Sequence, residues 1–169
     1  MKRVCALPLS KWSLIVAIVI FSCRSFGAAD DSFSQLVGSA YSVETGALLY
    51  RETHQQVSKD TYKVEYSEPN GRVFADKTID FSKSRITPTF SQLNKRNGEK
   101  IDVTRRGDQL QIRYRENSNA KIEKNVLKLA PGMVVDAGFD AFVKQYWGSL
   151  ISGKEMDIEY LVPSRQSTF

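Results

Sequence analysis

The fold class is decided by residues 101–115, which read Ile-Asp-Val-Thr-Arg-Arg-Gly-Asp-Gln-Leu-Gln-Ile-Arg-Tyr-Arg. On both sides of the central Gly107-Asp108, apolar and polar residues alternate, which is the pattern of a β-strand with one buried and one solvated face. Glycine and aspartate adopt the backbone angles of a tight turn at little cost. The stretch therefore predicts a β-hairpin whose second strand carries Arg113 and Arg115 on the solvated face.

The same pattern extends in both directions along the chain. Residues 61–66 alternate, Pro69-Asn70-Gly71 supplies a turn, and the returning strand at 72–81 has Lys77 as the one charged residue in its apolar phase. Asn97-Gly98 is a further strong hairpin signal. Other candidate strands lie at 48–54, 86–93, 122–129 and 156–162. We expect about seven or eight strands, mostly in meander order.

One segment departs from the strand pattern. Between residues 139 and 151 apolar side chains recur at spacings of three and four, which predicts one amphipathic helix over about 137–152. Asp136 is its expected N-cap, and Gly153 is expected to end it. The predicted fold is therefore mainly β: a curved antiparallel meander sheet or half-barrel, with this helix packed on it before a final strand.

The first 29 residues have the composition of a leader. Three basic residues before position 12, an apolar run at 12–21 and small residues at 27–29 are typical of a secretory signal peptide. Cleavage after Gly27 and cleavage after Ala29 both fit the pattern, and an uncleaved N-terminal anchor is the alternative. We expect a signal peptide at 1–29, a flexible tail at 30–35 and a single β-rich domain at 36–169.

Cys23 raises a second possibility for the leader. The run Ile-Phe-Ser-Cys that ends at Cys23 is similar to the lipobox of bacterial lipoproteins, in which the cysteine is acylated. That pattern usually has a small residue where this chain has Phe21. We therefore expect Cys23 to be removed with the leader rather than lipidated.

The charge of the chain is concentrated in two places. The sequence has 24 basic and 19 acidic residues, a net charge of +5. Four of the basic residues and no acidic residue lie in the leader, so the remaining chain has a net charge of +1 and no cysteine. A near-neutral domain gives no reason to expect nucleic-acid binding. Residues 83–128 nevertheless hold 12 basic and 5 acidic residues.

Within 83–128, the best candidates for an anionic-partner patch are Arg105, Arg106, Arg113 and Arg115. Side chains on neighbouring strands lie about 5 Å apart, so these residues can gather on one face. Lipid phosphate or lipopolysaccharide would suit such a patch. Nucleic acid would require aromatic residues for base stacking, and only Tyr114 is near, in the opposite phase. The alternative is a set of solvated strand faces.

Catalytic and metal-binding patterns are scarce. His54 is the one histidine of the chain, and we expect it on the surface, since a general base would also need a positioned partner and a nucleophile. The sequence has no Gly-x-Ser-x-Gly nucleophile elbow. Glu155, Asp157 and Glu159 share one strand face, which is explained as the solvated side of an amphipathic strand rather than as a calcium site. We expect no catalytic residue, no metal and no cofactor.

A resemblance covers roughly the last quarter of the chain. Residues 131–140 (Pro-Gly-Met-Val-Val-Asp-Ala-Gly-Phe-Asp), 142–147 and 161–165 resemble a stretch found in secreted proteobacterial proteins of unknown function. The resemblance implies a bacterial envelope location. The order of strands, helix and strand is also similar to that of lipocalins, although the Gly-x-Trp signature of that family is missing near the first strand.

These observations favour a non-catalytic secreted protein, most simply periplasmic, that binds an apolar or amphiphilic ligand such as a lipid. The helix residues expected to contact the ligand are Phe142, Tyr146 and Leu150. The alternative is a structural or interaction module that docks another envelope component through its basic face or an exposed edge strand. Membrane contact is expected only through a lipidated Cys23 or an uncleaved leader. The ligand, the oligomeric state and a cavity under the helix stay open, as does a shortened C-terminus.

Overall fold

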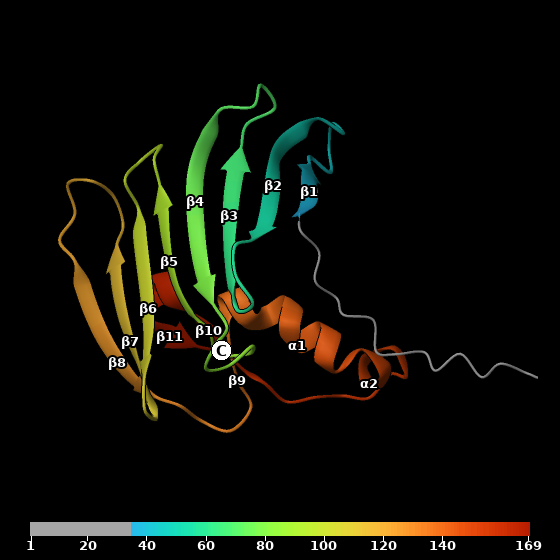
Figure 1. Ribbon diagram of the computed structural model, residues 1–169, viewed down its shortest axis with the longest axis vertical. Helices are drawn as coiled ribbons and strands as arrows, with labels where there is room; N and C mark the ends of the chain where they lie inside the picture. The colour runs from blue at the N-terminus through green and yellow to red at the C-terminus, as the bar shows by residue number, and fades with distance from the viewer. Residues whose placement is uncertain (1–34) are drawn as a thin grey trace, which may run out of the picture. The chain divides into compact units, whose positions relative to one another are not determined.

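The computed structural model of the protein describes residues 35–169 (Figure 1). Eight antiparallel strands form one sheet in which each strand pairs with its neighbours in the sequence, and the two end strands do not meet. The predicted mainly-β fold and its meander order are therefore confirmed. The strands are β1 (Gln35–Tyr41), β2 (Leu48–Gln56), β3 (Thr61–Ser67), β4 (Val73–Asp80), β5 (Thr89–Asn94), β6 (Lys100–Arg106), β7 (Gln109–Arg115) and β8 (Glu123–Lys128).

A second, smaller sheet follows the meander. Its strand β10 (Glu159–Val162) lies between β9 (Met133–Val135), with which it is parallel, and β11 (Ser167–Thr168), with which it is antiparallel. A short 3-10 helix, η2 (Pro163–Arg165), joins β10 to β11. The parallel pair requires a crossover connection, and the helical segment supplies it.

The helical segment is divided where the sequence predicted one helix. It consists of η1 (Asp136–Gly138), α1 (Phe139–Gln145) and α2 (Trp147–Ile151), with non-helical backbone angles at Tyr146 between the last two. No side chain caps any of the three. The expected N-cap role of Asp136 is therefore wrong, because its carboxylate accepts a hydrogen bond from Tyr160 instead.

Two strand boundaries also differ from the prediction. The strand expected at 86–93 begins at Thr89, in agreement with the rule that proline, here Pro88, cannot donate to a strand ladder. The last strand begins at Glu159 rather than at 156. The predicted leader at 1–29, with Cys23, lies outside the described residues, and Gln35, the last residue of the predicted tail, begins β1.

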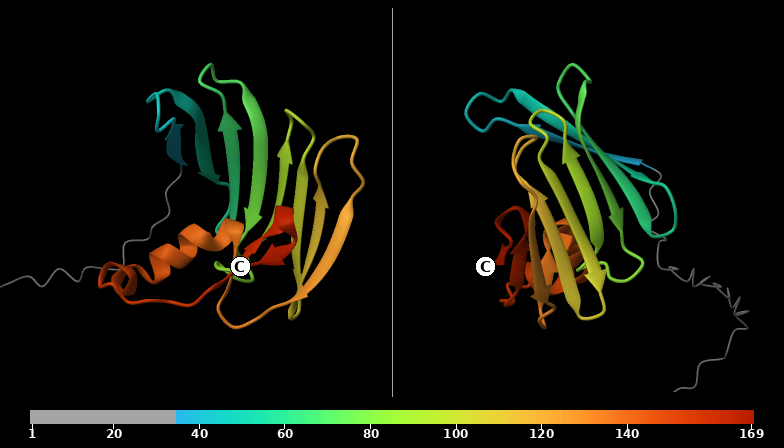
Figure 2. Two further views of the ribbon diagram at one scale, coloured as in Figure 1. Left: turned by 180° about the vertical axis from the view of Figure 1, so that it is seen from behind. Right: turned by 90° about the vertical axis from the view of Figure 1, so that its left-hand side faces the viewer.

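The core lies between the large sheet and the small one. We call the face of the eight-stranded sheet that packs against β9–β11 the inner face, and the opposite face the outer face. Figure 2 shows the helices and the small sheet against one end of the strands, which extend beyond them. The core combines residues of both sheets, namely Val64, Ile79, Phe90, Ile101, Val103, Leu110, Ile112, Met133, Val135 and Leu161.

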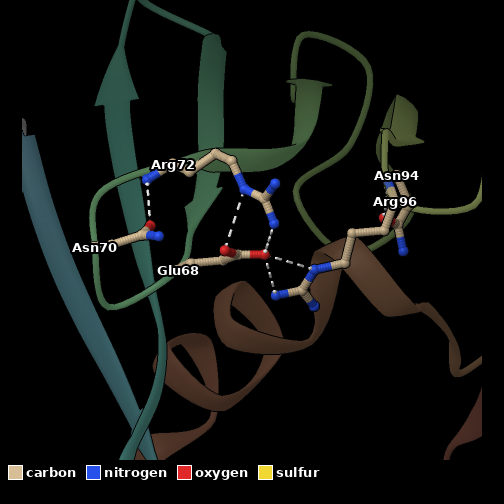
Figure 3. Close-up of polar contacts among 5 residues, drawn as sticks. All are labelled: Glu68, Asn70, Arg72, Asn94 and Arg96. Atoms are coloured by element: carbon tan, nitrogen blue, oxygen red, sulfur yellow. Dashed lines mark hydrogen bonds and ion pairs between the residues drawn. The ribbon is translucent and has the colours of Figure 1, made fainter.

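The β3–β4 and β5–β6 hairpins are tied together by one carboxylate (Figure 3). Glu68 Oε1 accepts hydrogen bonds from Arg72 Nη2 at 2.7 Å and from Arg96 Nη2 at 3.2 Å. The hydrogen bond from Arg72, followed by that from Arg96, holds the pKa of Glu68 below its usual range. The Asn70 and Asn94 side chains accept from the backbone N–H groups of Arg72 and Arg96, which fixes both turns.

Candidate functional site

Strands β2, β3 and β4 place polar side chains side by side on the inner face. Glu52 pairs with Tyr66 across β2 and β3, and Lys77 pairs with Val64 across β3 and β4. Val64 is fully buried in the core, so the side chains that share its phase point to the inner face. The sequence signalled only Lys77 among these residues, because it is the charged residue in an otherwise apolar phase.

We call the connected polar side chains the polar row, and they are Glu52, His54, Tyr66, Lys77, Asp136 and Tyr160. His54 and Glu52 form its first pair. His54 Nε2 lies 2.9 Å from Glu52 Oε1, and both side chains are half-buried. The hydrogen bond from His54 is the main cause that holds the pKa of Glu52 below its usual range, and the Tyr66 hydroxyl adds a second hydrogen bond. The histidine expected on the surface is half-buried and has a carboxylate partner, since the β2 pleat directs both side chains to the inner face.

Lys77 and Asp136 form the second pair and connect the large sheet to the helical segment. Lys77 is 9% exposed, and its Nζ lies 3.8 Å from Asp136 Oδ2. The ammonium also lies 5.8 Å from the ring centroid of Tyr66 and 5.5 Å from that of Phe90. A cation over aromatic faces is attracted by the ring quadrupoles. Within residues 35–169, Nζ makes no hydrogen bond, so its three donors remain available.

Asp136 is in turn bound by β10. The Tyr160 hydroxyl donates to Asp136 Oδ1 at 2.9 Å. Burial, and then the bond to Asp136 and its charge, raises the pKa of Tyr160 to about 12. Burial, followed by the charge of Glu52, likewise raises the pKa of Tyr66. Both phenols therefore stay protonated at neutral pH and serve as donors to carboxylates.

The bond between Tyr160 and Asp136 predicts a loss of stability in alkali. Because the tyrosine pKa is 10.0 when unperturbed and about 12 when folded, the stabilisation is complete below pH 10 and disappears as the pH rises to about 12. We expect Tyr160→Phe to lose less of its free energy of unfolding across this interval than the unaltered protein. Denaturant unfolding at several pH values measures this loss. Identical losses in the two proteins would contradict a stabilising bond between Tyr160 and Asp136.

An aromatic group adjoins the polar row. The ring centroids of Tyr50, Tyr66 and Phe74 lie 6.2 to 6.3 Å apart. Phe74 joins the other two because Tyr66 pairs with Ala75 and Ser67 with Val73, which leaves Phe74 as the extra residue of a β-bulge. The Arg96 guanidinium lies 3.5 Å from the centroid of the Phe74 ring, so the Glu68 cluster of Figure 3 also covers this aromatic group.

The three predicted ligand residues of the helix differ in their exposure. Phe142 is 6% exposed, and its ring centroid lies 4.9 Å from that of Tyr146 and 6.4 Å from that of Phe139. Tyr146 and Leu150 are half-buried. Phe142 therefore packs the helix, whereas Tyr146 and Leu150 retain surface that a ligand can contact.

The four predicted patch arginines do not share one environment. Arg106 and Arg113 are exposed on the outer face. Arg105 shares the phase of the buried Ile101 and Val103, and its Nη1 donates to Thr87 Oγ1 at 3.1 Å. Arg115 is half-buried and donates twice to the Gly98 carbonyl, at 3.0 and 3.2 Å. Arg105 therefore cannot act together with the other three.

The described part of the chain has neither a metal-binding cluster nor a membrane-spanning helix. Residues 35–169 contain no group of three or more His, Cys, Asp or Glu side chains placed to hold a metal ion. Over the same residues, no helix combines the length and the apolar character needed to cross a bilayer. Of the acidic row at 155–159, only Glu159 belongs to a strand.

Function has to be inferred from this geometry. The polar row links β2, β3, β4, η1 and β10, and the aromatic group lies beside it. In comparisons with known proteins, no family model, no curated protein and no solved structure matches the chain.

Proposed function

We propose that the protein is a non-catalytic, secreted protein of the bacterial envelope that binds an amphiphilic ligand, such as a lipid, on the inner face of its large sheet. The observation that carries the proposal is the contact between the aromatic group and the polar row. Tyr66 belongs to both, since its ring faces Tyr50 and Phe74 and its hydroxyl bonds to Glu52. Such a surface offers rings to an apolar chain and charges to a headgroup.

The apolar part of this surface extends to the edge of the sheet. Leu36 on β1 pairs with His54, so it lies on the inner face, and it is 53% exposed. Phe139 at the start of α1 is 41% exposed, and its ring centroid lies 5.6 Å from that of Tyr160. Apolar side chains thus lie at both ends of the polar row. We assign the acyl part of the ligand to them, with Tyr146 and Leu150 on the helical side.

The polar part has one group suited to an acidic headgroup. The Lys77 side chain is 9% exposed and its ammonium has hydrogen-bond donors to spare, although Asp136 at 3.8 Å balances its charge. A buried ammonium is costly unless it is paired and hydrogen-bonded, and a phosphate or carboxylate oxygen would complete its hydrogen bonding. We assign the His54–Glu52 pair a positioning role beside the headgroup rather than proton transfer.

Native mass spectrometry of the protein purified gently from the bacterial envelope tests the proposal. We expect an adduct of lipid mass on the folded protein. The same spectrum gives the mass of the processed chain, which reports cleavage of the leader or acylation at Cys23. A bare chain under conditions that preserve non-covalent complexes would overturn ligand binding.

A matched pair of variants tests the location of the site. Leu36 and Val37 are neighbours on β1 and are both 53% exposed, but they lie on opposite faces of the strand. We expect Leu36→Asp to reduce the adduct about tenfold, because a carboxylate repels an apolar chain, and Val37→Asp to leave it unchanged. Circular dichroism shows whether both variants are folded. Equal retention of the adduct by the two variants would place the ligand elsewhere.

A further inference from the structure

Three strands of the outer face, β6, β7 and β8, form a strongly basic surface. The strand register aligns their outward side chains in rows across the three strands. One row holds Asp102, Arg113 and Lys124, and another holds Arg106, Gln109 and Lys128. Only one carboxylate, that of Asp102, lies among them. We call the six cations of this surface the outer basic face, and they are Lys100, Arg106, Arg113, Arg115, Lys124 and Lys128.

Most of these cations have no partner among residues 35–169. Asp102 forms an ion pair with Lys100 at 3.4 Å. Within the part of the chain that the structure describes, the exposed side chains of Arg106, Arg113, Lys124 and Lys128 form no ion pair or hydrogen bond. Arg113 even pairs directly with Lys124 across β7 and β8, an arrangement of like charges that destabilises a sheet.

The other half of the outer face has a different character. On β3, Lys63 forms an ion pair with Glu65 at 3.5 Å, and on β4, Asp76 forms one with Lys95 at 2.8 Å. Mixed charges of this kind are sufficient to keep a protein soluble. The need for solubility is thus already met on this half of the face. It therefore does not account for the unpaired positive charge of β6–β8.

Protection of the sheet edge accounts for only part of this surface. Lysines on an edge strand prevent pairing with another chain, and Lys124 and Lys128 lie on the edge strand β8. Arg106 and Arg113 lie on β6 and β7, which have neighbours on both sides. Their charges do nothing for an edge, so they require another explanation.

We infer that the outer basic face docks onto an anionic lipid bilayer surface. Basic residues near such a surface are each attracted by the lipid phosphates, and the attraction falls off within a Debye length. The outward residues between the cations are Thr104, Gln109, Gln111 and Val126, with no aromatic ring for base stacking, which disfavours nucleic acid. Such docking needs neither a lipidated Cys23 nor an uncleaved leader, through which alone the sequence led us to expect membrane contact.

Co-sedimentation with vesicles tests this inference on protein purified from the envelope. We expect binding to phosphatidylcholine vesicles that contain phosphatidylglycerol, weak binding to phosphatidylcholine alone, and loss of binding at high salt. The variant Arg113→Glu/Lys124→Glu should bind at least about thirtyfold more weakly, because each basic residue lost from a membrane surface costs about a factor of five and the two new carboxylates add repulsion. Lys59→Glu/Lys63→Glu makes the same change of charge on the β2–β3 side and should bind as the unaltered protein does.

The other outcomes are distinguishable. Equal binding by Arg113→Glu/Lys124→Glu and the unaltered protein would overturn the inference and assign membrane contact to the leader or an acyl chain. Binding to single-stranded DNA in place of vesicles would also overturn it. Ligand retention on the inner face is measured separately by native mass spectrometry. Arg113→Glu/Lys124→Glu should keep the lipid adduct, so failure of one proposal does not imply failure of the other.

Discussion

Gly138→Ala is expected to destabilise the protein by about 3 kcal/mol, near the upper end of the usual cost of overpacking. Gly138 is buried between η1 and α1, where an added Cβ would lie 2.1 Å from the carbonyl oxygen of Ile86 and 2.9 Å from that of Arg85. Both atoms belong to the backbone, so no side-chain rotation relieves the clash. The loop and the helical segment would have to separate.

The loop that Gly138 approaches is held in place, which is why the cost should be high. The Val135 N–H donates to the Ile86 carbonyl at 3.0 Å, and the Thr87 N–H donates to Ser84 Oγ at 3.0 Å. Pro88, next to Thr87, is among the fully buried residues. Movement of the loop would therefore break these bonds or expose buried surface.

Thermal unfolding followed by circular dichroism measures the effect of Gly138→Ala. For a domain of this size, 3 kcal/mol corresponds to a decrease in Tm of about 10 °C. Gly148→Ala is the matched control, because Gly148 lies in α2 and no atom comes within 4 Å of its added Cβ. We expect that variant to be slightly stabilised, since alanine favours helix over glycine. Equal Tm values for the two variants would show that the approach to Ile86 is not tight.

Leu161→Ala is expected to cost about 2–5 kcal/mol, because it leaves a cavity in the core. Leu161 has no exposed surface and lies on the central strand of the small sheet, paired with Val135 on one side and Thr168 on the other. It belongs to the same core cluster as Leu110 and Ile112 of β7. Its truncation therefore weakens the attachment of the small sheet to the large one.

Hydrogen exchange distinguishes this local weakening from general loss of stability. In Leu161→Ala we expect the amides of β9 and β10 to lose more protection than those of β3 and β4, since local opening costs less than global unfolding. Ile151→Ala provides the control, because Ile151 is 66% exposed and its truncation should change little. Uniform loss of protection over both sheets would contradict an independent attachment of the small sheet.

The meander was predictable because its signals are local. The turns at Asn70-Gly71, Asn97-Gly98 and Gly107-Asp108 follow from residue types that tolerate positive φ, and all three glycines have it. β1 was missed because an edge strand with mostly exposed residues lacks the apolar alternation that marks β3, β4, β6 and β7. The parallel pairing of β9 with β10 was also missed, because it joins residues about 26 apart across the helical segment, and no local pattern encodes it.

The candidate site was only partly predictable for the same reason. Glu52 and His54 are two residues apart on one strand, so the alternation rule already places them on the same face. That rule also places Arg105 and Arg106 on opposite faces of their strand. Asp136 reaches Lys77 only through the packing of the two sheets, and sequence spacing gives no indication of that contact.

The neighbour-to-neighbour order of β1–β8 has a consequence for how the chain folds. Every pairing in the large sheet joins consecutive strands, so each closure spans a connection of two to eight residues and the sheet can grow one hairpin at a time during synthesis. The core, however, is completed only when Met133, Val135 and Leu161 reach the inner face. Until then the apolar side of the sheet is uncovered, and a chaperone that shields it during folding would prevent association between unfinished molecules.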